Sequence, residues 1–334
     1  MKSLFEGVGT ALITPFNTEG AIDFPSFGRL VDRQLEAGIN ALIVGATTGE
    51  GACLRAEEKE ELIVAAAERV RGFYGSDEKE RPAVIAGISC NVTSAAEEYC
   101  RRLGNLPADG LLVTTPFYNK TSQKGLIRFY ERLADASPKP IIIYNVPQRT
   151  GMTVSPSVYE VLSAHPNICG IKEADSDMNR FPDAVKAAEN LTIYSGCDEL
   201  ALPMFCLGAG GWISVVSNLF PEKCVELYEA FLSGFNRKAA AINSEILPFV
   251  RLAFSEVNPV PVKAMAAFLN LCEERVREPL CALGKEEREK LSEEFGRLGG
   301  FGVERAFTAK PDKCENRGRG VRTGGEREYS CSRR

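Results

Sequence analysis

Residues 140–174, PIIIYNVPQRTGMTVSPSVYEVLSAHPNICGIKEA, contain the repeating unit that decides the fold. A continuous apolar run rich in β-branched residues (140–146) is followed by a helical pattern (155–164) and by a second apolar run (168–174). Continuous rather than alternating apolar runs are typical of parallel strands that are covered on both faces. The stretch therefore predicts a strand–helix–strand unit whose two strands are parallel.

The same unit recurs on both sides of this stretch. Six further apolar runs lie at 8–16, 41–46, 83–89, 110–116, 191–196 and 210–216. Apolar residues at i, i+3 and i+4 predict helices at 24–38, 56–70, 94–103, 126–136 and 178–190. Eight strands that alternate with helices predict an α/β fold, a (β/α)8 TIM barrel, over residues 1–220. A doubly wound sheet is the competing architecture, but it needs a glycine-rich first turn, and GAGG (208–211) precedes a strand instead of following one.

The rest of the chain differs from the repeating unit. Residues 221–298 hold further helical patterns and predict a C-terminal helical extension of the barrel. Residues 299–334 are rich in Gly, Arg, Lys and Ser, which is typical of a disordered tail. The NRGRGVRTGG stretch of this tail is compatible with RNA contact, but its composition favours a solvated extension. Residues 71–82 predict a polar surface loop before the third strand.

Composition narrows the classes of function. The 334 residues are 44% hydrophobic with a formal net charge of −5, so a large core is available and a nucleic-acid partner is not expected. No apolar run of about 18 residues occurs, so no membrane segment is expected. The 11 cysteines are scattered without a CxxC pair, which predicts free thiols and a cytoplasmic protein. A single histidine, His165, excludes Ser-His-Asp chemistry and a multi-histidine metal site within one chain, so no metal is expected.

A lysine lies within the apolar run 168–174. In a barrel of this type the chemistry lies at the carboxyl ends of the strands, and Lys172 is close to such an end. Lysine is rarely buried, and desolvation lowers the pKa of an amine enough to favour attack on a carbonyl. A structural ion pair with Glu173 or another barrel acid is the competing interpretation, and Lys172 alone leaves the two evenly balanced.

Hydroxyl groups at neighbouring strand ends favour the nucleophile. Imine formation needs protons moved on and off the carbinolamine oxygen, and Tyr144, Thr47 and Tyr118 are placed to relay them. The Thr47-Thr48-Gly49 turn offers backbone N–H groups and hydroxyls to a carboxylate. Arg149 offers a planar fork to a second carboxylate. Taken singly, each of these residues is compatible with packing, an ordinary turn or a solvated charge.

A set of short motifs gives the sequence a family resemblance. From about residue 5 to 298 the chain resembles the dihydrodipicolinate synthase and N-acetylneuraminate lyase superfamily, and the motifs follow the family order. The matching motifs are ITPF, GATTGE, VIAGIS, VTTPFYN, YNVPQRTG, GIKEAD, YSGCD, GWISV and NPVPVKAM.

The resemblance implies a role for each matching residue. Among the catalytic residues, Lys172 matches the Schiff-base lysine, Tyr144 the proton shuttle, Thr47 the relay threonine and Tyr118 the tyrosine that reaches into a neighbouring subunit's site. The implied substrate-binding residues are Thr48, with Gly196 and Ile213 lining the pyruvate pocket, and Arg149 for the carboxylate of the aldehyde.

Arg149 distinguishes branches within the superfamily, because the sialic-acid lyases and sugar-acid aldolases lack it. The resemblance thus implies a Schiff-base-forming lyase that condenses pyruvate with L-aspartate-4-semialdehyde in lysine and diaminopimelate biosynthesis, without a cofactor. It also implies a homotetramer, a dimer of dimers that share Tyr118. Two alternatives stay open: a pyruvate aldolase or lyase for another aldehyde, and a non-catalytic barrel with a binding role.

The resemblance also bears on feedback inhibition. Lysine-inhibited relatives line their allosteric pocket with polar residues, whereas the matching positions here hold Ala56, Lys59, Ala95 and Phe117, and only Asn91 is retained. We therefore expect weak or absent inhibition by lysine, and titration of the condensation activity with L-lysine measures it. Strong inhibition at sub-millimolar lysine would contradict this expectation.

Overall fold

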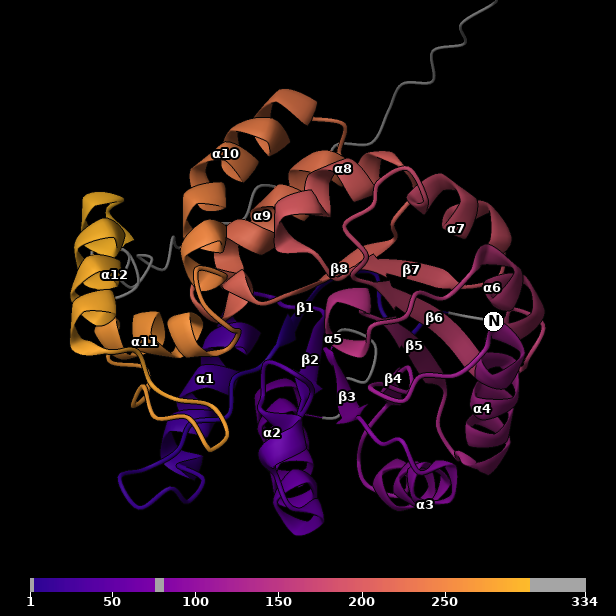
Figure 1. Cartoon of the computed structure of the whole chain (residues 1–334). Coiled ribbons are helices and arrows are strands. Elements are labelled where there is room, and N and C mark those ends of the chain that lie inside the picture. The colour runs from indigo at the N-terminus through magenta and orange to yellow at the C-terminus, as the bar shows by residue number, and fades with distance from the viewer. Residues whose placement is uncertain (1–2, 76–80, 301–334) are drawn as a thin grey trace, which may run out of the picture. The chain divides into compact units, whose positions relative to one another are not determined.

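Eight short parallel strands close into a barrel in the computed structural model, which describes residues 3–75 and 81–300 (Figure 1). The TIM barrel expected from the sequence is therefore confirmed. Each strand pairs with the next, and the last pairs with the first. The strands are β1 (Gly7–Ala11), β2 (Ala41–Val44), β3 (Ala83–Ile88), β4 (Gly110–Thr114), β5 (Ile141–Asn145), β6 (Ile168–Glu173), β7 (Thr192–Ser195) and β8 (Gly211–Ser214).

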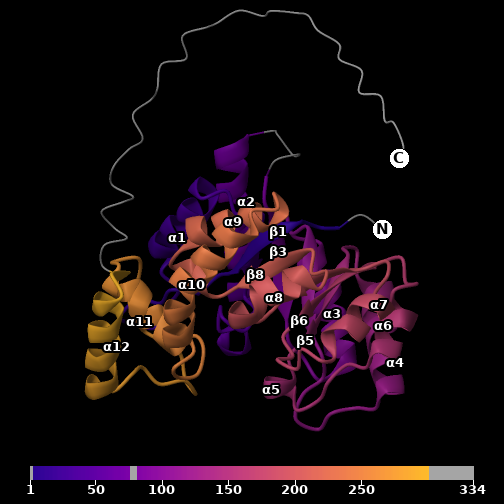
Figure 2. The same ribbon diagram turned by 90° about the horizontal axis from the view of Figure 1, so that it is seen from above.

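Helices surround the strands, because each strand buries its outward apolar side chains against them (Figures 1 and 2). The helices that follow β1 to β7 are α1 (Phe24–Glu36), α2 (Ala56–Tyr74), α3 (Thr93–Gly104), α4 (Gln123–Ala136), α5 (Pro147–Thr150), α6 (Pro156–Leu162), α7 (Phe181–Ala187) and α8 (Ala201–Cys206). The short helices α5 and α8 were not expected, since four or six residues give too little periodicity to detect.

Two local expectations are wrong. The first strand ends at Ala11 and not at residue 16, and Pro15 beyond it has no N–H for the sheet. The surface loop expected at 71–82 does not begin at residue 71, because α2 continues to Tyr74, and residues 76–80 of this range lie outside the described residues. Gly75 ends this helix with a φ of 65°, a conformation that glycine adopts without strain, and its N–H donates to the Arg71 carbonyl.

The expected C-terminal helices are α9 (Pro221–Leu232), α10 (Asn236–Ala253), α11 (Val260–Phe268) and α12 (Lys285–Arg297). Helix α9 packs against β1 and so covers the barrel where the sheet closes. Helices α10, α11 and α12 lie together at one side in both views (Figures 1 and 2). Of the expected tail at 299–334, residues 301–334 lie outside the described residues. None of the described helices has the length and apolarity to cross a bilayer.

The barrel interior is filled at its amino-terminal end. The rings of Phe5 and Tyr194 stack with centroids 4.3 Å apart, and the Tyr194 hydroxyl donates to the Phe5 carbonyl at 2.8 Å. A Cβ on Gly170 or Gly211 would come within 3.0 or 2.9 Å of the Tyr194 ring. Glycine at these two positions therefore lets one large ring lie across the interior, and the free space is left at the carboxyl ends of the strands.

A buried ion network joins the C-terminal helices to the loop after β2. The ammonium of Lys263, in α11, lies 2.6 Å from Glu50 Oε1 and donates to the Thr14 carbonyl at 2.8 Å, and both ionic side chains are fully buried. Arg277 donates its backbone N–H to Glu50 and two guanidinium N–H groups to Glu58 at 2.7 and 2.8 Å. The Arg277 guanidinium lowers the pKa of Glu58 to about 2. The network fixes the residues that follow Thr48.

Replacement of Lys263 by Met should be strongly destabilising, because it leaves the Glu50 carboxylate buried and unpaired. We expect a loss of about 3–5 kcal/mol of unfolding free energy, measured by urea denaturation. The matched control is Lys223→Met, which breaks a half-exposed pair with Glu245 and should cost less than about 1 kcal/mol. Equal losses in the two variants would contradict the role given to the buried pair.

Candidate functional site

A cleft of about 610 Å³ opens at the carboxyl ends of the strands. It is lined by five of the residues singled out in the sequence, namely Thr48, Tyr144, Arg149, Lys172 and Gly196. The strand ends that carry these residues are far apart in the sequence, and closure of the barrel brings them together. The structure therefore brings these five positions together at one cleft, and their roles stay a prediction.

Lys172 lies near the end of β6 and is only 4% exposed. Its Nζ lies 4.5 Å from the centroid of the Tyr144 ring, and the two residues are register partners on β6 and β5. Within residues 3–75 and 81–300, no carboxylate forms an ion pair with this ammonium and no group forms a hydrogen bond with it. A buried amine that lies over an aromatic ring and is not held in an ion pair is typical of a reactive lysine.

Glu173 does not pair with Lys172. Side chains alternate along a strand, so Glu173 points to the outer face of the barrel while Lys172 lines the cleft. The Glu173 carboxylate accepts hydrogen bonds from Asn145 Nδ2, from the Tyr159 hydroxyl and from the Asp175 backbone N–H, each at 2.8 Å. The structural ion pair that competed with the nucleophile in the sequence is thus absent from the described residues.

Gly196 gives the Lys172 side chain its space. A Cβ at this position would lie 3.0 Å from Lys172 Cε and 2.8 Å from the Ala174 Cβ. The Gly196 N–H donates to the Glu173 carbonyl at 2.6 Å, which holds the end of β7 against β6. A larger residue would push against the lysine from the adjacent strand.

The turn after β2 is held from several sides. The Thr14 hydroxyl donates to the Gly49 carbonyl at 2.7 Å, and the Glu50 N–H donates to the Thr47 carbonyl at 3.0 Å. Thr48 is buried, and its hydroxyl accepts a hydrogen bond from Asn258 Nδ2 at 3.0 Å. Thr47 is half-buried and does not line the cleft in this chain.

The sequence had suggested that Arg149 lies in a loop, but the structure places it in the short helix α5. This single turn ends at Gly151, which has a φ of 71° and donates its N–H to the Pro147 carbonyl. The Arg149 Nη2 donates to the Asn258 carbonyl at 3.1 Å. The guanidinium therefore lies at the cleft wall opposite the strand ends, in a position set by the segment before α11.

Besides Thr47, two more of the expected residues lie outside the cleft lining. Ile213 is fully buried in β8 and belongs to the barrel core. Tyr118 is 90% exposed with a φ of 65°. Its loop is held by Asn91, whose side chain accepts from the Phe117 N–H at 2.8 Å and donates to the Phe117 carbonyl at 2.7 Å. A large aromatic ring is thus presented to solvent by an ordered turn.

The sequence-based prediction missed a group of residues that complete the cleft. Those from the C-terminal region lie at the end of α10 and in the segment after it, far from any strand end. Asn258 is 6% exposed, and its Oδ1 has no hydrogen-bond partner among the described residues. Its NPVPVKAM motif was the available signal. The further lining residues that were not singled out include Gln148, Cys197, Asp198, Glu199, Arg251, Phe254, Glu256, Val257 and Asn258.

Asp198 and Cys197 follow β7 and differ from Lys172 in reactivity. Burial raises the pKa of Asp198 to about 6, although hydrogen bonds from the Val216 N–H and Trp212 Nε1 and the charge of Lys172 oppose this shift. Burial also raises the pKa of the Cys197 thiol to about 12, so this thiol is protonated at neutral pH and is a poor nucleophile. Of the two candidate nucleophiles on neighbouring strands, the amine is the better one.

The chemistry of the cleft is that of an amine and hydroxyls beside hydrogen-bond donors for carboxylates. No three His, Cys, Asp or Glu side chains gather at metal-ligand spacing in the part of the chain that the structure describes. Thr48 and Arg149, which are both hydrogen-bonded to Asn258, offer a hydroxyl and a guanidinium to acidic groups of a small molecule in this cleft.

Comparison with known proteins identifies the family. The model of the dihydrodipicolinate synthetase family matches residues 4–296. The 4-hydroxy-tetrahydrodipicolinate synthase of Alkaliphilus oremlandii (strain OhILAs) is 41% identical over 293 residues, which cover 87% of this chain and 98% of that protein.

Solved structures agree with the sequence relatives. The dihydrodipicolinate synthase of Aquifex aeolicus is 37% identical with a TM-score of 0.82, covering 88% of this chain and 98% of that one. The chloride-inhibited dihydrodipicolinate synthase of Acinetobacter baumannii, solved with pyruvate, is 33% identical with a TM-score of 0.82, covering 88% and 99%. With its barrel, its cleft lysine and a family match that spans nearly all of the described residues, the chain belongs to the dihydrodipicolinate synthetase family.

Proposed function

We propose that this chain is a 4-hydroxy-tetrahydrodipicolinate synthase, which condenses pyruvate with L-aspartate-4-semialdehyde through a Schiff base on Lys172. The observation that carries the proposal is the unpaired, buried Lys172 amine at the bottom of a cleft, 4.5 Å from the Tyr144 ring. Its relatives bear the same name at about 40% identity, and one related structure was solved with pyruvate.

The first steps take place on pyruvate. The neutral Lys172 amine attacks the pyruvate C2 carbonyl, the carbinolamine loses water, and an imine forms. Tyr144 protonates the departing oxygen, with Thr47 and Tyr118 as relays to solvent. The C3 proton passes to Tyr144 to give the enamine, whose C3 attacks the carbonyl carbon of the aldehyde, and the alkoxide so formed takes up the proton from Tyr144. Finally the amino group of the second substrate displaces Lys172 and closes the ring, which frees the enzyme.

Each substrate has its own carboxylate site in this proposal. The turn that carries Thr48 holds the pyruvate carboxylate, with Gly196 shaping the pocket, because exposed N–H groups and a hydroxyl suit an anion. Arg149 holds the carboxylate of the aldehyde substrate. The unpaired Oδ1 of Asn258 lies next to both sites, since this residue is hydrogen-bonded to Thr48 and to Arg149. As an acceptor it suits the substrate's ammonium group.

The active form includes more than one copy of the chain. Exposure of 90% is unusual for a tyrosine held by an ordered turn, and it suits a ring that completes the site of a second copy. We propose a homotetramer, a dimer of dimers in which each dimer exchanges Tyr118. The nine cysteines among the described residues are all thiols, which is typical of a reducing compartment, and a cytoplasmic location is part of the proposal.

Borohydride reduction in the presence of pyruvate tests the first covalent step. We expect one pyruvate-derived adduct per chain, mapped by mass spectrometry to Lys172, and none in Lys172→Met. Lys186→Met, which removes a lysine from α7 outside the cleft, is the control and should trap as the native chain does. An adduct on another lysine, or no adduct, would refute the proposed function.

Replacement of Arg149 by Ala tests the identity of the second substrate. A hydrogen bond to a charged group is worth about 1.5–3 kcal/mol, so kcat/KM for aspartate semialdehyde should fall by roughly 10- to 100-fold. Pyruvate trapping on Lys172 should be unchanged. Arg251→Ala removes another arginine of the same cleft and should have a much smaller effect. Unchanged turnover in Arg149→Ala, with activity on other aldehydes, would favour a pyruvate aldolase of different specificity.

A further inference from the structure

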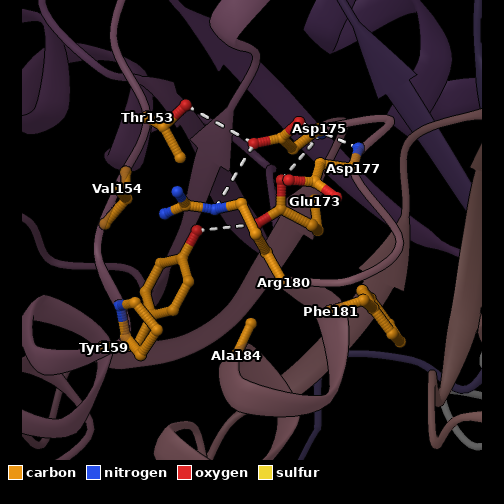
Figure 3. Close-up of a pocket in the computed structure, with 10 residues that line it drawn as sticks. Thr153, Val154, Tyr159, Glu173, Asp175, Asp177, Arg180, Phe181 and Ala184 are labelled. Atoms are coloured by element: carbon orange, nitrogen blue, oxygen red, sulfur yellow. Dashed lines mark hydrogen bonds and ion pairs between the residues drawn. The ribbon is translucent and has the colours of Figure 1, made fainter.

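Behind the strands that carry Tyr144 and Lys172, a second polar cluster lies on the outer face of the barrel (Figure 3). Its centre is Glu173, which is 5% exposed and adjacent to Lys172 in β6. Figure 3 shows the Tyr159 hydroxyl of α6 directed at this carboxylate, with Asp175 and Arg180 beside it. The space among these side chains is only about 10 Å³, so the cluster is packed and has no room for a ligand.

Asn145 connects the cluster to the neighbouring strand. It follows Tyr144 in β5 and is the register partner of Glu173, just as Tyr144 is the register partner of Lys172. Its Nδ2 donates to Glu173 Oε1 at 2.8 Å, and its Oδ1 accepts the Val154 N–H at 3.2 Å. The two side-chain pairs therefore lie next to each other across the β5–β6 boundary, one on each face of the sheet.

The Glu173 carboxylate also fixes the end of its own strand. Oε1 accepts the Asp175 N–H at 2.8 Å, and the Glu173 carbonyl accepts the Gly196 N–H at 2.6 Å. Backbone from β5, β6 and β7 is thereby joined at the level of the lysine. A shift of about 1 Å between reacting groups is enough to lower the rate roughly a hundredfold, so these hydrogen bonds are placed to affect catalysis.

We infer that Glu173 is a positioning residue for Lys172 and Tyr144, acting from the outer face of the barrel through Asn145 and the backbone at the ends of β5, β6 and β7. The inference rests on the proposed function. In its ionised form the carboxylate is an acceptor only, and it matches the three donors that face it. When it is protonated, one oxygen becomes a donor, so one of the three facing donors is no longer matched unless the Tyr159 hydroxyl turns to accept.

The surroundings of Glu173 set the pH at which this change occurs. Burial raises the pKa of Glu173 to about 7, opposed by the hydrogen bonds from Asp175, Tyr159 and Asn145. Several titratable and charged groups surround Glu173, and they come from the loop after β6, from α6, from the start of α7 and from the end of β7. They are Asp175, Asp177, Tyr159, Arg180 and Cys197, while Lys172, its neighbour in β6, lies on the opposite face of the strand. A carboxyl whose pKa is raised loses its proton as the pH rises, so the matched form predominates only above about pH 7.

Steady-state kinetics of the full chain over a range of pH test the inference. In the native chain, kcat should rise as the pH increases through about 7. Glu173→Gln should lack this acidic limb and should lower kcat about tenfold at high pH, with little change in KM for pyruvate. Tyr159→Phe removes a donor that favours the carboxylate, so it should move the limb to higher pH. Glu160→Gln, on the exposed side of α6, should leave the profile unchanged.

The outcomes separate this inference from the proposed function. If the native chain gives no borohydride adduct on Lys172, the proposed function itself fails. If the native chain is trapped but Glu173→Gln keeps the acidic limb, Glu173 is not the positioning group. A limb that does not move in Tyr159→Phe contradicts the inference as well, and this variant keeps the test valid if Glu173→Gln does not fold. A purely structural role would lower activity in equal proportion at every pH and leave the limb in place.

Discussion

Hydrogen bonds from β5 and β7 fix the register of β6, and the period of two along a strand then separates two adjacent ionisable side chains. Lys172 lines the cleft, and Glu173 lies on the outer face among donors. If β6 slipped by one residue, the carboxylate would enter the cleft and the amine would lie against α6. The chemistry of the site thus depends on the same pairing that closes the barrel.

A lysine fits inside the barrel because its neighbours leave it room. Tyr194 and Phe5 fill the interior below it, and Gly170 allows this by the absence of a Cβ next to the Tyr194 ring. At the level of the lysine, Gly196 removes side-chain volume from β7. The interior therefore changes from close packing to an open cleft within one or two residues along each strand. That change gives the amine access to the cleft without exposing it fully to water.

Much of this arrangement could be predicted from sequence. The apolar runs gave the eight strands, and Lys172 stood out because lysine is rare in such runs. The predictions failed where a contact joins distant parts of the chain or where an element is very short. Helix α5, which carries Arg149, has four residues and no periodicity of its own. Asn258 is the first residue of the NPVPVKAM motif, but no role was predicted for it. Nothing in the local sequence shows that the segment before α11 reaches Thr48. The exposure of Tyr118 likewise depends on the turn held by Asn91, 27 residues earlier in the chain, and no local pattern reveals that contact.

The C-terminal helices do more than cover the barrel. Lys263 of α11 pairs with Glu50, directly after the turn that carries Thr48, and Asn258 just before α11 is bonded to Thr48 and Arg149. A barrel without this segment would lose one wall of the cleft and the partner of a buried carboxylate. Because an unpaired buried charge is so costly, the Glu50–Lys263 pair forms only when the segment is seated. The packed C-terminal region therefore completes the cleft, which explains why residues so far from any strand end contribute to the site.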